Sequence, residues 1–295
     1  MVVLYYLLYA FIWLLFWLPL PILYGISYIL YFLAYYVVKY RKDVVRNNLI
    51  SCFPEKSKEE IIDIEKRFYL FFADTAIETL KLIHLSKDEI KERFKINNPE
   101  ELERLFEKGR SVMIVLGHYG SWEWSPSLYL HYHGVTGAEM YRPIKNPYLN
   151  KFFLKLRSIY GTETLPKNES YRYIIKYLHE GKVFGLGLIA DQTPSIPNLH
   201  FWTHFLNHPD TPFLNGPERI ARKADLAFVY LDVKRVKRGY YSCDLITLAE
   251  HAKETQEDEL TQRYAELMER TILRDPAYWL WTHRRWKHKR NKENN

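Results

Sequence analysis

The apolar positions divide the chain into a strongly apolar beginning and a longer, more polar remainder. No charged side chain occurs from Met1 to Val38, and Lys39 is the first. Pro19 and Pro21 interrupt this stretch, because proline removes a backbone donor and disfavours helix before it. We therefore expect two apolar segments, near residues 2–18 and 22–38.

The length and composition of residues 1–38 predict a membrane anchor, formed by a tight hairpin or by one span plus an interfacial helix. The stretch lacks the basic region and small-residue cleavage site of a secretory signal. A very aromatic pair of core helices in a soluble protein is the alternative. The basic residues that follow, Lys39, Arg41, Lys42 and Arg46, predict that the rest of the chain faces the cytoplasm.

The remaining pattern predicts a helical subdomain over residues 39–98 and an α/β domain over residues 99–295. Apolar residues at three- and four-residue steps, such as Ile61, Ile64 and Phe68, indicate amphipathic helices before the boundary at Pro99. Helices and strands then alternate, which is typical of a mostly parallel central sheet flanked by helices. The expected strands are 111–116, 138–141, 162–165, 183–190, 226–233 and 240–247; the expected helices are 99–108, 147–159, 169–179, 214–224 and 255–273, with another opening near an N-cap at Ser121.

Three chemically active side chains follow three of the expected strands. His118 comes after strand 111–116, Arg142 after strand 138–141 and Asp191 after strand 183–190. Ligands of open α/β sheets bind outside the carboxyl ends of the strands, so these residues predict a common site. Taken singly, Arg142 reads equally well as a solvated turn residue and Asp191 as a cap.

Glu123 lies five positions after His118, inside the first turn of the helix expected from Ser121. A carboxylate bonded to one imidazole nitrogen fixes the tautomer and makes the other nitrogen a better base. The alternative is a loop histidine and a solvated glutamate that interacts favourably with the helix dipole.

The charge distribution limits the classes of binding partner, and the cysteines bear on metal binding and on the redox compartment. The net charge is +7, and much of the surplus lies in a basic C-terminal run: Arg284, Arg285, Lys287, Lys289, Arg290 and Lys292. Beside a membrane anchor this run favours anionic lipid or an acidic protein over nucleic acid, for which no motif is present. The alternative is a charged C-terminus that is solvated and binds no partner. Cys52 and Cys243 form no zinc pattern and suit a reducing compartment.

Several blocks, in order, resemble the late acyltransferases of lipid A biosynthesis. His118 and Glu123 match that superfamily's His-x4-acidic motif, with the Glu that is more typical of the lipid A branch. The Phe-Pro-Glu-Gly block of glycerophosphate acyltransferases is not evident downstream of His118. The matching blocks are the apolar N-terminus, residues 44–49, 52–55, 117–123, 141–143, 190–193 and 279–287.

The resemblance implies a membrane-bound O-acyltransferase in a bacterial inner membrane, with its catalytic domain facing the cytoplasm. It implies acyl carrier protein as donor, a hydroxyl of a lipid A precursor as acceptor, and no cofactor or metal. His118 would act as general base, Glu123 would orient it, and Arg142 and Asp191 would bind substrate. Backbone amides after Gly120 are candidate oxyanion donors.

Other acceptors and other function classes remain open from the sequence. A lysophospholipid or an amino lipid also presents a hydroxyl at the interface. A non-catalytic lipid-binding membrane protein and a lipid hydrolase are the alternatives of a different class. A hydrolase with a covalent intermediate would need a serine elbow, Gly-x-Ser-x-Gly, which does not occur in the chain.

Overall fold

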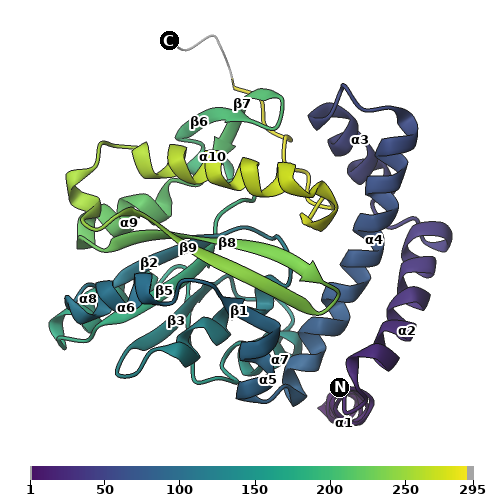
Figure 1. Cartoon of the computed structure of the whole chain (residues 1–295), viewed down its shortest axis with the longest axis horizontal. Helices are drawn as coiled ribbons and strands as arrows, with labels where there is room; N and C mark the ends of the chain where they lie inside the picture. The colour runs from purple at the N-terminus through teal and green to yellow at the C-terminus, as the bar shows by residue number, and fades with distance from the viewer. Residues whose placement is uncertain (1, 291–295) are drawn as a thin grey trace.

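The computed structural model describes residues 2–290, and its centre is a seven-stranded sheet with helices packed around it (Figure 1). This confirms the predicted α/β class. The strand order is β1-β9-β8-β2-β5-β3-β4. The strands are β1 (Phe94–Ile96), β2 (Val112–Leu116), β3 (Thr136–Tyr141), β4 (Glu163–Pro166), β5 (Phe184–Ile189), β8 (Ala227–Lys237) and β9 (Tyr240–Ala249).

The sheet is parallel except for one pair. β8 and β9 form an antiparallel hairpin that turns at Gly239, where φ is +73°. A positive φ is easily adopted by glycine, which has no Cβ. The central strand β2 is buried along its whole length and pairs in parallel with both β5 and β8. Its apolar, β-branched sequence suits a strand that is covered on both faces.

Most of the predicted helices of the α/β domain are present within a few residues of their expected bounds. They are α6 (Glu100–Glu107), α7 (Pro147–Arg157), α8 (Ser170–His179), α9 (Gly216–Ala224) and α10 (Glu259–Arg274). The sequence pattern did not predict β1 or the two-stranded hairpin of β6 (Phe201–Phe205) and β7 (His208–Phe213). Both are short, and β7 contains two prolines, which weakens any strand pattern.

The helix predicted after Ser121 is instead a 3-10 helix, η3 (Trp122–His131). The predicted N-cap at Ser121 is wrong, since its side chain makes no capping hydrogen bond and its buried Oγ has no partner among the described residues. Pro126 inside this segment has no N–H to continue an α-helical ladder. This change of geometry affects where Glu123 points.

The region before β1 is helical, as predicted, with α3 (Lys42–Cys52), α4 (Lys58–Lys81) and α5 (Lys87–Arg93). α4 begins at a capping box in which Ser57 and Glu60 satisfy each other's backbone donors. β1 lies within residues 39–98 yet pairs with β9 of the main sheet. The division into three domains at residues 38 and 98 stays a prediction.

The apolar N-terminus forms α1 (Val2–Leu15), α2 (Leu20–Phe32) and a π-helical turn, η1 (Leu33–Val37). The break falls at Pro19 and Pro21, in agreement with the sequence pattern. Figure 1 shows α2 beside α4, at the edge of the domain. One helix in the described chain, Leu20–Val37, is long and apolar enough to cross a membrane, judged by length and composition alone.

Candidate active site

His118 follows β2 directly, in the loop that leads from the buried strand to η3. Gly117 precedes it at a point of close approach: a Cβ there would lie 2.3 Å from the Met268 sulfur and 3.3 Å from the Asp191 carboxylate. Only glycine lets the chain pass so close to α10 and to Asp191. The tight passage fixes the start of the loop and therefore the position of the imidazole.

Asp191 follows β5, the strand that pairs in register with β2, with Leu116 opposite Ile189. Adjacent parallel strands end at the same edge of the sheet, so the two residues meet there. The Asp191 Oδ1 lies 2.6 Å from the His118 Nδ1, and its Oδ2 accepts the His118 backbone N–H at 2.9 Å. The Asp191 side chain is 1% exposed and that of His118 is 18% exposed.

Trp279 provides the third contact to Asp191, because its indole N–H donates to Oδ2 at 2.7 Å. Burial alone would raise the pKa of Asp191. The His118 imidazole and the three hydrogen bonds outweigh burial and hold the pKa below its ordinary value. Asp191 is therefore ionised at neutral pH, and the hydrogen bonds from His118 and Trp279 stabilise its negative charge.

This ionised carboxylate determines which nitrogen of His118 carries the hydrogen. A carboxylate can only accept, so Nδ1 is the protonated nitrogen of the neutral ring and Nε2 keeps its lone pair. Nε2 lies 3.3 Å from the Gln192 amide nitrogen, which is a long contact. The arrangement leaves Nε2 as the basic atom of the site.

Glu123 does not make the predicted contact with His118, since Asp191 holds the Nδ1 position. Both Glu123 oxygens instead accept from the Arg157 guanidinium of α7, at 2.9 and 2.6 Å. The prediction of this contact is wrong because the 3-10 helix turns the carboxylate toward α7. A catalytic role for Glu123 stays a prediction, and its side chain lines the same cavity as His118.

Two adjoining cavities open from the strand ends. The smaller has a volume of about 280 Å³, and His118, Glu123 and Arg157 are among its lining residues. The larger has a volume of about 790 Å³, and Lys167 is among the residues that line it. Arg142 is exposed and borders both cavities. It has no hydrogen bond or ion pair with any residue that the structure describes. Its guanidinium is therefore available to an anionic group.

Glu139 on β3 is a titratable residue that the sequence pattern did not single out. It lies opposite Gly187 of β5, where a Cβ would come within 2.5 Å of its carboxylate, and it borders the His118 cavity. Burial raises its pKa to about 8; Arg157 opposes the shift and Glu123 adds to it. Glu139 is thus largely protonated at neutral pH.

Two site residues that the sequence did not reveal come from elements far away along the chain. Trp279 reaches Asp191 because residues near it pair with the His118 loop: Leu280 N–H donates to the His118 carbonyl, and Tyr119 and Trp279 form an isolated bridge. The only sequence signal was that Trp279 opens the last block of the family resemblance. Arg157 gave no signal, since it looks like an ordinary helix-end arginine.

The basic C-terminal run is not uniformly solvated. Arg285 is 1% exposed and its guanidinium lies over the Phe213 ring, 4.5 Å from the centroid. His283 accepts the Thr193 N–H, and burial with nearby Arg285 lowers its pKa to about 4. Lys292 lies outside the described residues. Across residues 2–290 no cluster of three His, Cys, Asp or Glu side chains is placed to hold a metal ion.

An imidazole backed by a buried carboxylate, at the strand ends of an α/β sheet and beside cavities bordered by arginine, is typical of enzymes that activate a hydroxyl nucleophile. The chain matches the model of the family described as bacterial lipid A biosynthesis acyltransferase over residues 1–288, and it belongs to that family. It is an acyltransferase, which confirms the enzyme class and the resemblance noted from the sequence.

Two curated relatives agree with this membership. The chain is 25% identical over 254 residues to a lipid A biosynthesis palmitoleoyltransferase of Escherichia coli (strain K12), covering 85% of this chain and 80% of the relative. The same identity and coverage hold for a lipid A biosynthesis acyltransferase of Shigella flexneri.

Proposed function

We propose that this protein moves a fatty acyl chain from an acyl carrier protein thioester to a hydroxyl of a lipid A precursor, with His118 as general base. The observation that carries the proposal is the His118–Asp191 pair. Asp191 occupies Nδ1 and leaves Nε2 as the basic atom of a side chain that lines a cavity. Family membership and the two relatives supply the reaction class and the lipid acceptor.

The reaction is a direct transfer in this proposal. His118 Nε2 takes the proton of the acceptor hydroxyl as its oxygen attacks the thioester carbonyl. The tetrahedral oxyanion then collapses and the carbon–sulfur bond breaks. The imidazolium returns its proton to the departing thiolate, so the products are an ester and a free carrier thiol. Asp191 stabilises the imidazolium between the two proton transfers.

Glu123 acts on the substrate side of the site through Arg157 in this proposal. Their two-bond pairing holds the guanidinium rigid at the wall of the His118 cavity. Arg142 binds a phosphate of the acceptor or the developing oxyanion, because its forked donors suit either group. The larger cavity, with Lys167 and Arg142 at its border, is the proposed place for the acceptor's polar head.

The proposed location is a bacterial inner membrane, with the α/β domain on the cytoplasmic side. Acceptor and product are both amphiphiles, so the site must be reached from a lipid surface. The surplus of positive charge would steer an acidic carrier protein and make the rate sensitive to salt.

The test is a transfer assay with the purified protein, a mixture of long-chain acyl carrier protein thioesters and a lipid A precursor, read by mass spectrometry. We expect the acceptor to gain one acyl chain, and His118→Gln to lose about 10²–10⁴-fold in rate while remaining folded. Full activity in folded His118→Gln would refute the assignment of the base.

Three further arms separate the competing functions. A lysophospholipid acylated in preference to the lipid A precursor would refute the acceptor. Coenzyme A thioesters used as well as carrier-protein thioesters would refute the donor. Free fatty acid released at the same rate without any acceptor would indicate a hydrolase.

A further inference from the structure

The N-terminal pad, which we define as residues 2–38 and which comprises α1, α2, η1 and the residues that join and follow them, has an unusual distribution of side chains. Residues on one face of α2 and η1 recur at helical spacing and are buried against the domain; they are Leu20, Leu23, Tyr24, Ser27 and Tyr35. The opposite face is apolar and exposed. Tyr24, Ser27 and Tyr35 therefore face the protein together with two leucines, and the exposed side chains of this segment are apolar or aromatic.

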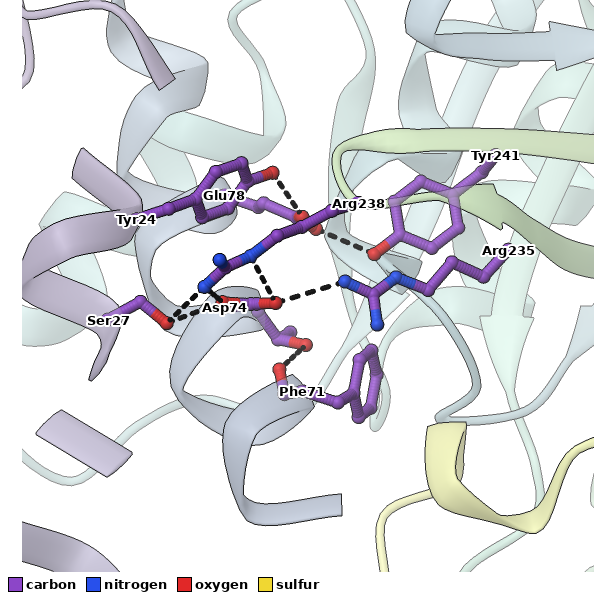
Figure 2. Close-up of polar contacts among 9 residues, drawn as sticks. Tyr24, Ser27, Phe71, Asp74, Glu78, Arg235, Arg238 and Tyr241 are labelled. Carbon is purple, nitrogen blue, oxygen red and sulfur yellow. Dashed lines mark hydrogen bonds and ion pairs between the residues drawn. The ribbon is translucent and has the colours of Figure 1, made fainter. Parts of the chain in front are cut away.

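Figure 2 shows how the polar face is attached. Ser27 donates to Asp74 of α4, and Tyr24 donates to Glu78 of α4 at 2.8 Å. Asp74 and Glu78 are fully buried. The attachment is thus made of buried polar contacts at the middle of α2, and sliding or tilting α2 away would remove one hydrogen bond from each of these two buried carboxyl groups.

The β8–β9 hairpin closes this network from the other side. Arg238 donates to Asp74 Oδ2 at 2.9 Å and lies between two rings of α2, 4.1 Å from the Tyr24 centroid and 4.6 Å from that of Tyr28. Arg235 donates to the same Asp74 oxygen at 3.0 Å. We call this set of residues, with Glu78 and Tyr241, the pad network (Figure 2).

α1 is attached to the domain by a separate set of contacts. The Lys81 ammonium donates to the carbonyl oxygens of Phe16 and Leu18. The His84 Nε2 forms a hydrogen bond with the carbonyl oxygen of Trp13. These bonds satisfy carbonyls that a helix end leaves without partners. On its other side Tyr9 packs against Phe152 of α7.

This attachment is incompatible with a helix that crosses the bilayer. Leu20–Val37 would extend about 27 Å, just enough to span a core of about 30 Å. Its midpoint, however, lies next to Asp74 and Arg238, and the hairpin tip beside them exposes Lys234 and Lys237. A spanning α2 would place these charges near the centre of the bilayer, where each charged side chain is strongly disfavoured.

We infer that the N-terminal pad is a monotopic docking surface for an anionic phospholipid monolayer, and that α2 lies in the interface without crossing it. The apolar outer face enters the acyl region, and the polar inner face stays bound to the domain. The outward residues, all exposed, are Leu7, Leu8, Phe11, Leu14, Trp17, Ile22, Ile29, Phe32, Leu33, Val37 and Val38. So many exposed apolar side chains on one N-terminal segment indicate a binding surface.

Charge at the margins of the pad identifies the lipid as anionic. Exposed lysines lie at separate points beside it: Lys39 follows η1, Lys237 precedes the hairpin turn whose Gly239 approaches Tyr24, and Lys155 donates to the Tyr9 hydroxyl. Their ammonium groups would reach the head groups when the pad is buried. The arrangement rests on the proposed function only in that substrate and product are membrane lipids.

The decisive experiment measures membrane depth along α2 and η1. Spin labels at Ile22, Ile29, Leu33 and Val37, which share one outward stripe over about 22 Å of helix, are read by oxygen and nickel-chelate accessibility. The full-length protein is bound to phosphatidylethanolamine–phosphatidylglycerol vesicles. We expect four similar, shallow depths. A label at exposed Leu273 on α10 is the control and should show no contact with lipid.

Two outcomes would overturn the inference. A spanning helix gives depths that differ by about 10 Å or more, deepest at Ile29 and shallowest at the two ends. Absence of lipid contact at all four labels, with the apolar face covered by a second copy, also refutes it. Neither outcome depends on catalysis, so this failure is distinct from failure of the transfer assay.

Recognition of anionic lipid is measured separately, by sedimentation of the protein with the same vesicles. Lys39→Gln and Lys237→Gln should each weaken binding by roughly fivefold, and the effect should vanish on phosphatidylcholine vesicles. The matched control is Arg172→Gln, an exposed arginine on α8 at the far end of the molecule (Figure 1), which should bind like the parent. Equal effects of all three substitutions would refute the recognition of anionic lipid by the pad margin.

Discussion

Two buried acid clusters in this protein differ in one respect that separates chemistry from attachment. In the pad network every oxygen of Asp74 and Glu78 accepts a hydrogen bond from protein, and both acids are fully buried (Figure 2). At the strand ends Asp191 is equally satisfied, but its partner His118 retains a basic nitrogen beside a cavity. A buried charge whose hydrogen-bond partners all belong to the protein fixes geometry, whereas a basic nitrogen beside a cavity, held only by a long contact with Gln192, is placed to react.

The largest expected difference between the two clusters is in activity. Asp191→Asn should reduce the rate of acyl transfer by about 10³–10⁴-fold with little change in KM, because an amide can donate to Nδ1 and move the imidazole hydrogen to Nε2. Rates under substrate saturation measure it. The control is Asp63→Asn on α4, an exposed acid, which should match the parent.

The same assay decides between Asp191 and Glu123 as the acid that orients His118. Glu123→Gln keeps shape but weakens the pairing with Arg157, and we expect a loss of about 10-fold to 100-fold. A greater loss in Glu123→Gln than in Asp191→Asn would contradict the orienting role that the contacts of Asp191 indicate.

In the pad network the large effect should be on stability. Asp74→Ala leaves Arg235 and Arg238 without their carboxylate and should lower the free energy of unfolding by about 3–5 kcal/mol. Denaturant titration in detergent micelles measures this. Transfer per folded molecule should stay near that of the parent, since no residue of the network lines the His118 cavity or the larger cavity beside it.

Asp63→Ala serves as the matched substitution on the same helix. Asp63 is exposed and should change the unfolding free energy by less than about 0.5 kcal/mol. If Asp74→Ala were no more damaging than Asp63→Ala, the network would not fix α2 to the domain.

The sequence predicted the strand-end residues better than the contacts between them. Placement of His118 and Asp191 followed from apolar strands and from the rule that parallel strands end at one edge. Which acid meets His118 depended on the geometry after Ser121, where Pro126 favours a 3-10 helix over an α-helix. The spacing of five residues between His118 and Glu123 could not distinguish a 3-10 helix from an α-helix.

The pad network was not predictable from local patterns. Ser27 and Tyr24 look unremarkable in an apolar segment, and Asp74, Arg235 and Arg238 look like surface charges of an amphipathic helix and a hairpin. Their meaning depends on contacts between residues far apart along the chain, such as Arg238 with Asp74. The apolar composition predicted an affinity for membrane but not the depth of the helix.

A pH experiment tests the buried acid Glu139, which borders the His118 cavity. The pKa of Glu139 is raised to about 8, so the folded state holds its proton more tightly than the unfolded chain. Its destabilising effect is therefore absent below about pH 4.5 and grows as pH rises to about 8. Glu139→Gln should raise Tm by a few degrees at about pH 8.5 and by much less at about pH 5.

Exposed Glu103→Gln on α6 is the control for this experiment, with no pH-dependent difference expected. Thermal unfolding at both pH values gives the result. An equal Tm difference at the two pH values would contradict a raised pKa at Glu139.

The smallest predicted effect concerns one hydroxyl of the pad network. Ser27→Ala removes the donor from α2 to Asp74, yet Asp74 keeps its arginine partners, so the unfolding free energy should fall by only about 1 kcal/mol. Exposed Ser158→Ala is the control. If α2 is bound through Asp74, combining Ser27→Ala with Asp74→Ala should cost less than the sum of the two single losses, because both remove the same contact. Strict additivity would show that Ser27 stabilises α2 by some other route.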